Sequence, residues 1–184
     1  MKQIKGIEFL VFDLDGTLVN SQYDLGDALN FALFRLAKPQ LAYTDIPSML
    51  GGGLRHLISQ ALDTTVKEEI EEAVVFFNEF YEKNHTAKTA YYAGVAETLG
   101  RLNSKKMAVL SNKPHRFTQG IISKLDKTGH FEVVMGADAE KYALKPSAQG
   151  LEIILQHFNI APEKALMIGD STHDIMAAKS IGMY

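Results

Sequence analysis

Three things that the sequence lacks narrow its possible functions. It has no cysteine, which excludes disulfide bonds, a thiolate nucleophile and cysteine-bound zinc or iron–sulfur centres. It has no excess of basic residues, with 19 Lys and Arg against 22 Asp and Glu, so nucleic acid and anionic membranes are not expected partners. It has no apolar run of membrane-spanning length, and its first apolar run ends in two aspartates, unlike a signal peptide. These absences predict a soluble, cytoplasmic protein.

The most informative stretch lies near the start, where a largely apolar run over 7–12 ends at Asp13-Leu14-Asp15-Gly16-Thr17. Side chains alternate along a strand, so Asp13 and Asp15 are expected on the same side, where two anions repel unless a cation or proton intervenes. Gly16 permits a sharp exit from the strand, and Thr17 offers a hydroxyl and a backbone N–H to an anion. The structural alternative is a turn with acidic caps. Chance alone produces this combination in only about one such chain in a thousand, which favours a metal and anion site.

Residues 19–88 are predicted to form a small all-helical insertion. Ser21 with Asp24, and Thr65 with Glu68, each fit a capping box at the start of a helix. Apolar residues follow both pairs at helical spacing. We therefore expect a helical cap with a core of its own.

Residues 1–18 and 89–184 are predicted to form an α/β core with a doubly wound parallel sheet. From residue 94 onward, apolar runs of strand length alternate with helical patterns, as in such sheets. Pro114 suits the first position of the helix that follows the second strand. Besides the first strand, we expect strands at 107–110, 131–135 and 165–168.

Acidic residues follow the last predicted strand as well as the first. Asp170 follows Gly169 at the end of that strand, and Asp174 lies four residues further on. Together with Asp13 they could offer three carboxylates to Mg²⁺, which prefers oxygen ligands. Ser171 and Asp174 also fit a capping box, and we expect Asp174 to serve both the cap and the metal.

A phosphate-binding site is predicted at the end of the second strand. Ser111 and Asn112 can donate hydrogen bonds there, and the following helix adds backbone N–H groups. Lys145, which precedes a proline, could balance the charge of Asp13 and of a phosphate. A lysine beside a proline is commonly a solvated surface residue, but the other motifs in this sequence favour a role for Lys145 in the site.

The cap contains a second candidate anion site. Gly51-Gly52-Gly53 precedes a short helix that carries Arg55. Gly52 and Arg55 could receive an anionic substrate tail such as a carboxylate. A flexible helix start with a surface arginine is an equally weighted alternative.

These motifs, in this order, resemble those of the haloacid dehalogenase superfamily. The four motifs are residues 13–17, Ser111 after a strand, Lys145-Pro146, and Gly169-Asp170-Ser171-Thr172-His173-Asp174. The helical insertion lies where members with a small helical cap carry it. Within the superfamily the chain looks like the phosphoglycolate phosphatase group.

The resemblance implies specific roles. Asp13 is the nucleophile that forms an aspartyl phosphate, Asp15 is the acid and base, and Ser111 and Lys145 complete the catalytic set. Mg²⁺ is held by the carboxylates of Asp13 and Asp170 and the backbone carbonyl of Asp15, with Asp174 in support. The implied partner is a small phosphorylated metabolite bound by Thr17, Asn112, Gly52 and Arg55.

Three functional hypotheses follow: a Mg²⁺-dependent phosphatase, a phosphosugar mutase of the same superfamily, and a catalytically silent phosphate-binding module. The third arises because the chain stops at Tyr184, where family members run on through another strand, so the sequence could be a truncated form. A monomer or weak homodimer is expected. The sequence does not choose among phosphoglycolate, pyrophosphate, nucleotides and sugar phosphates.

Overall fold

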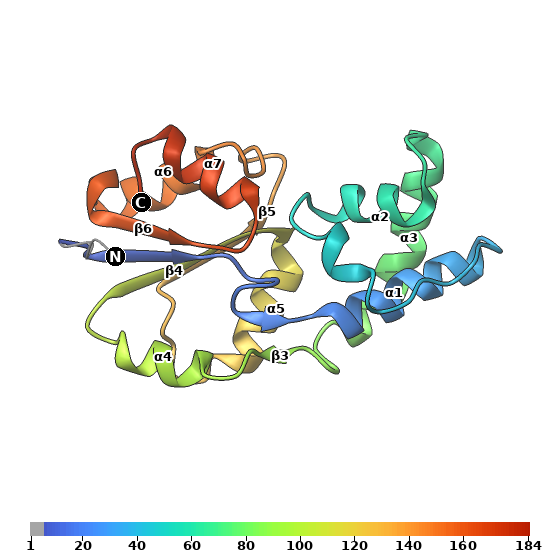
Figure 1. The fold of residues 1–184 in the computed structure, drawn as a ribbon, viewed down its shortest axis with the longest axis horizontal. Coiled ribbons are helices and arrows are strands. Elements are labelled where there is room, and N and C mark those ends of the chain that lie inside the picture. The colour runs from blue at the N-terminus through green and yellow to red at the C-terminus, as the bar shows by residue number, and fades with distance from the viewer. Residues whose placement is uncertain (1–5) are drawn as a thin grey trace.

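A four-stranded parallel sheet forms the centre of the computed structural model, which describes residues 6–184. The strands are β1 (Phe9–Phe12), β4 (Lys106–Pro114), β5 (Val133–Ala137) and β6 (Ala165–Ile168), in the order β5-β4-β1-β6. The chain moves outward from β1 to β4 and β5 and then returns to the other side of β1, so the strand order reverses there (Figure 1). This arrangement confirms the predicted α/β fold. The first five residues of the predicted core lie outside the described part.

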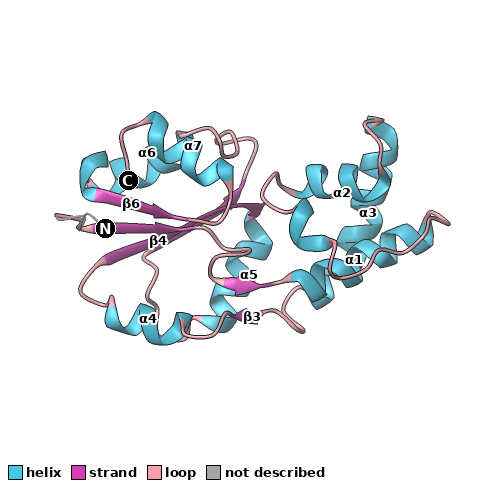
Figure 2. Cartoon of the chain, viewed as in Figure 1, coloured by secondary structure: helices cyan, strands magenta, loops and turns pink. Residues whose placement is uncertain are grey.

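Alternate residues of β1 face opposite sides of the sheet, and both sides are covered by helices (Figure 2). Phe9 and Val11 pack in a cluster with residues of α6 (Gln149–Phe158) and α7 (Thr172–Ser180). Leu10 and Phe12 pack on the opposite side with residues of α4 (Val95–Arg101) and α5 (His115–Leu125). The short helix η2 (Pro162–Lys164) precedes β6. Burial on both faces explains why β1 reads as a continuous apolar run.

A separate helical unit lies beside the carboxyl ends of the strands (Figure 1). We define the helical unit as α1 (Gln22–Arg35), η1 (Ile46–Met49), α2 (Leu54–Leu62) and α3 (Lys67–Asn84). It has its own apolar cluster, to which α5 of the core contributes Phe117. Two short strands, β2 (Val19–Asn20) and β3 (Ala90–Tyr91), pair in antiparallel fashion where the chain enters and leaves the unit. None of the helices over residues 6–184 has the length and apolar character needed to cross a membrane.

Two predicted capping boxes are wrong because their side chains have other partners or positions. Ser21 precedes α1 but makes no side-chain cap; its hydroxyl donates to Asp15 instead. Asp24 is buried and accepts hydrogen bonds from the segment after α3. Helix α3 begins after Val66, so the predicted pair of Thr65 and Glu68 does not cap it. For Asp24, a long-range contact therefore overrides the local pattern.

Several predicted element boundaries shift, by one to four residues. Strand β4 continues to Pro114, so α5 begins at His115 and Ser111 lies within the strand. The register between β4 and β5 is irregular between Leu110 and Pro114. Strand β5 begins at Val133, and Phe131, which precedes the strand, packs edge-on against Phe12. The irregular end of β4 supplies three consecutive side chains to the site described below.

Candidate active site

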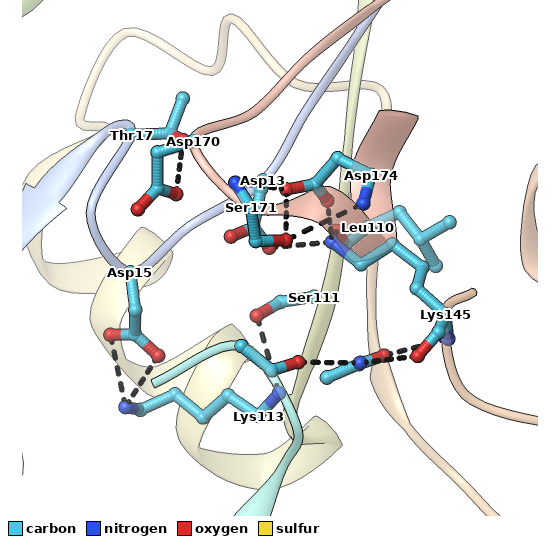
Figure 3. Close-up of polar contacts among 12 residues, drawn as sticks. Asp13, Asp15, Thr17, Leu110, Ser111, Lys113, Lys145, Asp170, Ser171 and Asp174 are labelled. Carbon is cyan, nitrogen blue, oxygen red and sulfur yellow. Dashed lines mark hydrogen bonds and ion pairs between the residues drawn. The ribbon is translucent and has the colours of Figure 1, made fainter. Parts of the chain in front are cut away.

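Three aspartates from two strand ends converge at the carboxyl edge of the sheet (Figure 3). Asp13 follows β1, and its backbone N–H donates to Ile168 O at 2.9 Å, which fixes the ends of β1 and β6 side by side. One carboxylate oxygen from each of Asp13, Asp170 and Asp174 lies within 4.8 Å of the others. Asp13 and Asp174 are buried, and Asp170 is exposed. The structure thus brings together the three carboxylates that the sequence predicts as metal ligands.

Lys145 joins two of these carboxylates. Its Nζ donates to Asp13 Oδ1 at 2.7 Å, to Asp174 Oδ1 at 2.6 Å and to Leu110 O at 2.8 Å. The side chain is buried, so these acceptors replace its water shell. Figure 3 shows the ammonium group lying between the two aspartates.

Asn112 fixes the backbone of Lys145. Asn112 Oδ1 accepts from Lys145 N at 2.9 Å, and Asn112 Nδ2 donates to Lys145 O at 2.8 Å. The same Nδ2 donates to Gly51 O at 2.8 Å, in the loop before α2. Asn112 therefore links the strand end, the lysine and the helical unit, and its amide is already engaged by protein groups.

Asp174 uses its two oxygens differently. Oδ2 accepts from Ser171 N at 3.1 Å and from Ser171 Oγ at 2.6 Å, and Ser171 caps the start of α7 in return. Oδ1 faces Lys145. The predicted capping box is confirmed, and it leaves one oxygen of Asp174 directed to the site.

Asp15 lies apart from the three-aspartate group, in an ion pair with Lys113. Lys113 Nζ is 2.9 Å from Asp15 Oδ2 and 3.1 Å from Oδ1, and the Ser21 hydroxyl also donates to Asp15. Burial opposes the charge of Lys113, but the Asp15 carboxylate raises the pKa of Lys113 above its ordinary value. We did not predict a role for Lys113 from the sequence. The available signal was a lysine directly after Ser111 and Asn112 at the end of a buried strand.

The electrostatic balance of the site calls for an additional cation. Burial raises the pKa of Asp13 to about 6; the Lys145 cation opposes this rise, and the Asp174 and Asp15 carboxylates add to it. Among residues 6–184, the cations that pair with these four aspartates are Lys113 and Lys145, which leaves a formal charge of −2. A divalent cation with oxygen preference matches both the charge and the donors.

Two glycines let the carboxylates approach. A Cβ on Gly16, whose φ is +84°, would lie 2.3 Å from Asp170 Oδ2. A Cβ on Gly169 would lie 2.4 Å from Asp174 Oδ2. The cluster is therefore built around positions where no side chain fits, and the residues present fit Mg²⁺.

A cavity that is partly open to solvent lies between the sheet edge and the helical unit. Asp13, Asp15 and Ser111 line it from the core. The helical unit contributes mostly apolar groups, and the loop before α2 contributes Gly51 and Gly53. The lining residues are Asp13, Asp15, Leu25, Leu50, Gly51, Gly53, Leu54, Leu57, Phe77, Tyr81, Ser111, Asn112, Lys113, Pro114 and Phe117.

The remaining predicted substrate residues lie at different distances from this cavity. Thr17 Oγ1 donates to Asp170 Oδ1 at 3.0 Å, beside the aspartate group. Gly52 is not part of the cavity lining, although its two glycine neighbours are. Arg55 is exposed and forms a two-pronged ion pair with Glu71 of α3, with distances of 2.5 and 2.9 Å. The structure therefore does not bring Arg55 to the other site residues.

Comparison with known proteins agrees with this geometry. The chain belongs to the haloacid dehalogenase-like hydrolase family, whose model matches residues 10–184. It is 33% identical over 189 residues to a phosphoglycolate phosphatase of Photobacterium profundum, covering 98% of this chain and 82% of that protein. It is 36% identical over 186 residues to a phosphoglycolate phosphatase of Nitrosococcus oceani, covering 96% of this chain and 81% of that protein.

A solved structure gives the same result for the fold. The crystal structure of a predicted phosphoglycolate phosphatase from Haemophilus somnus superposes with a TM-score of 0.88 and 29% identity, covering 98% of this chain and 84% of that chain. The relatives and this neighbour confirm the family resemblance and the predicted enzyme class, a phosphatase.

Proposed function

We propose that this protein hydrolyses a small phosphomonoester through an aspartyl phosphate on Asp13, with phosphoglycolate as the first candidate substrate. The observation that supports this most directly is the buried Asp13 carboxylate, which lines the cavity while Lys145 binds its Oδ1. A carboxylate so placed can attack a phosphorus atom that enters the cavity. Phosphoglycolate is proposed because relatives that are at least 30% identical carry that activity in their names.

The reaction has two halves. In the first, an oxygen of Asp13 forms a bond to phosphorus, the bond from phosphorus to the alcohol oxygen breaks, and Asp15 gives a proton to the departing oxygen. In the second, Asp15 takes a proton from water, whose oxygen attacks phosphorus and releases phosphate from Asp13. Lys113 and Ser21 hold the Asp15 carboxylate in the cavity for both steps.

The remaining site residues bind and orient the phosphoryl group. Lys145 offsets the negative charge on Asp13 and on the phosphoryl oxygens, and Ser111 offers its hydroxyl group and Thr17 its backbone N–H to those oxygens. Asn112 positions Lys145 through its two hydrogen bonds to that residue's backbone.

Mg²⁺ is the proposed cofactor. The carboxylates of Asp13 and Asp170 and the backbone carbonyl of Asp15 would hold it, with Asp174 in support. When bound, the ion neutralises charge that develops on the phosphoryl oxygens. The helical unit, proposed as a cap over 19–88, would cover the reacting groups, while 1–18 and 89–184 supply the chemistry.

The test is release of inorganic phosphate from a panel of phosphomonoesters, with Mg²⁺ or with EDTA. Wild type is compared with Asp13→Asn and with Asp27→Asn, a control at a half-buried residue of α1 that pairs with Lys88. We expect release that requires both Mg²⁺ and Asp13 and that Asp27→Asn leaves unchanged. No release by the folded wild type from any ester would refute the proposal. Transfer of the phosphoryl group to a sugar instead of water would support the mutase alternative.

A further inference from the structure

Tyr81 of α3 has a buried hydroxyl that makes no hydrogen bond of good geometry to any of residues 6–184. The side chain is 1% exposed and lines the cavity. Over residues 6–184, the hydroxyls of Tyr81 and Tyr91 are the buried side-chain polar atoms without a partner of acceptable geometry. Buried hydroxyls are normally paired, so an unpaired hydroxyl on a residue that lines the cavity points to a ligand.

The ring of Tyr81 is held firmly where the helical unit meets the core. Phe77 lies 4.9 Å from it and Phe117 of α5 packs edge-on at 4.7 Å, measured between ring centroids. Lys113 Nζ lies 5.1 Å from the centroid of the same ring. Burial raises the pKa of Tyr81 to about 12, against the opposing charge of Lys113. The hydroxyl therefore keeps its proton and can donate it in a hydrogen bond.

The polar groups of the cavity follow an order. Asp13 lies at the sheet edge, Asp15 is next to Lys113, and Lys113 is next to Tyr81. Among the described lining residues that the helical unit supplies, Tyr81 is the one with a polar side chain. A substrate whose phosphorus meets Asp13 and whose alcohol oxygen meets Asp15 would extend its tail toward Lys113 and Tyr81.

We propose that the Tyr81 hydroxyl and the Lys113 ammonium group together bind an anionic oxygen, of the carboxylate type, on the short tail of the substrate. This assignment rests on the proposed function and names its specificity residues. It replaces Arg55 in that role, because Arg55 is exposed and is not among the described residues that line the cavity. Lys113 supplies the charge and Tyr81 supplies a directed donor from the helical unit.

The experiment compares phosphoglycolate with ethyl phosphate, which is similar in length but has a methyl group where the other has a carboxylate. We expect Tyr81→Phe to raise KM for phosphoglycolate about tenfold and to change kcat/KM for ethyl phosphate less than about twofold. The matched control is Tyr91→Phe, which removes the other orphan hydroxyl, outside the cavity lining, and should change neither substrate. Loss of an unpaired buried hydroxyl should leave the Tm of both variants unchanged or raised.

A binding measurement makes the test independent of turnover. Calorimetry on Asp13→Asn, with and without Tyr81→Phe, should show about tenfold weaker binding of phosphoglycolate in the double variant and no change for ethyl phosphate. Equal affinity in the two proteins would overturn the proposal, as would a selective rise in KM for phosphoglycolate in Arg55→Met. Absence of Mg²⁺-dependent turnover in wild type would refute the proposed function alone, because the calorimetric comparison still decides the role of Tyr81.

Discussion

Lys145 Nζ lies 2.7 Å from Asp13 Oδ1, although 132 residues separate the two positions in the chain. The contact forms only when β1 and β4 pair, because Lys145 also donates to Leu110 O on β4. Its third acceptor, Asp174, belongs to the element that follows β6. One ammonium group therefore joins the ends of three parallel strands, and the site is assembled by the sheet.

Replacing Lys145 should abolish most activity. Lys145→Met removes the cation and leaves Asp13 and Asp174 as neighbouring buried anions. We expect kcat for phosphate release to fall at least about 100-fold. Lys145→Arg should not restore it, because a wider guanidinium cannot make the same three short contacts from a buried position. The control is Lys141→Met, an exposed lysine in the preceding segment that pairs with Asp138. Activity of Lys145→Met close to that of the control would contradict the role.

The raised pKa of Asp13 predicts a pH-dependent stability in EDTA. The folded pKa of about 6 exceeds the unfolded value of 3.8, so the folded state holds the proton more tightly. Stability that depends on this proton is fully present below about pH 4 and is lost as pH rises through about pH 6. At about pH 7.5, Asp13→Asn should therefore be more stable than wild type by roughly 1–3 kcal/mol, a rise in Tm of about 5 °C.

The measurement for Asp13 is thermal unfolding of both proteins across this pH range. The difference in Tm should shrink toward acid pH, and added Mg²⁺ should stabilise wild type more than Asp13→Asn. A difference in Tm that stays constant with pH would show that the Asp13 carboxyl does not titrate in this way.

The sequence predicted the parts of the site that depend on strand ends. Asp13, Ser111 and Asp170 follow or end apolar runs, and parallel strands necessarily bring such ends to one edge. The pairing of Lys113 with Asp15 could not be read in this way, because it depends on the irregular register at the end of β4. Local patterns can identify a strand end but not the direction of each side chain beyond it.

Local patterns also misled where a distant partner was stronger. Ser21 and Asp24 have the spacing of a capping box, yet each side chain binds a residue outside the first turn of α1. Arg55 follows a glycine run typical of an anion site, but its guanidinium group forms an ion pair with Glu71 on helix α3. Both outcomes depend on how helices pack, which the spacing of residues within one helix does not determine.

Replacing Gly53 with alanine should lower both stability and activity, for two separate reasons. Its φ is +86°, where a side chain costs about 1 kcal/mol, and a Cβ would lie 3.2 Å from Asn112 O and 3.1 Å from Leu144 Cδ1. Since Asn112 also holds Gly51 and Lys145, displacement of this loop should lower kcat/KM roughly tenfold. The measurements are steady-state kinetics and urea denaturation.

The matched control for Gly53 is Gly94→Ala. Gly94 has a φ of +83°, but a Cβ there would meet no atom within 4 Å. Gly94→Ala should lower the free energy of unfolding by about 1 kcal/mol, for the same conformational reason, and should leave the activity unchanged. Equal kinetic effects of the two variants would show that contact between the glycine loop and Asn112 does not matter for activity.

Asp24 ties the entrance of the helical unit to its exit. From helix α1, its buried carboxylate accepts the backbone N–H of Lys88 at 2.9 Å, and the N–H and hydroxyl of Thr89 at 2.8 and 2.7 Å. Asp24→Asn keeps the shape but turns one acceptor oxygen into a donor that faces these N–H groups. We expect a loss of about 2–4 kcal/mol in the free energy of unfolding, measured by urea denaturation. Asp27→Asn, on the same helix, breaks an ion pair with the exposed Lys88 ammonium group and should lose less than about 1 kcal/mol. Similar losses in both variants would contradict this role of Asp24, whereas the expected gap would show that its buried carboxylate, together with the β2–β3 pairing, holds the two chain crossings together.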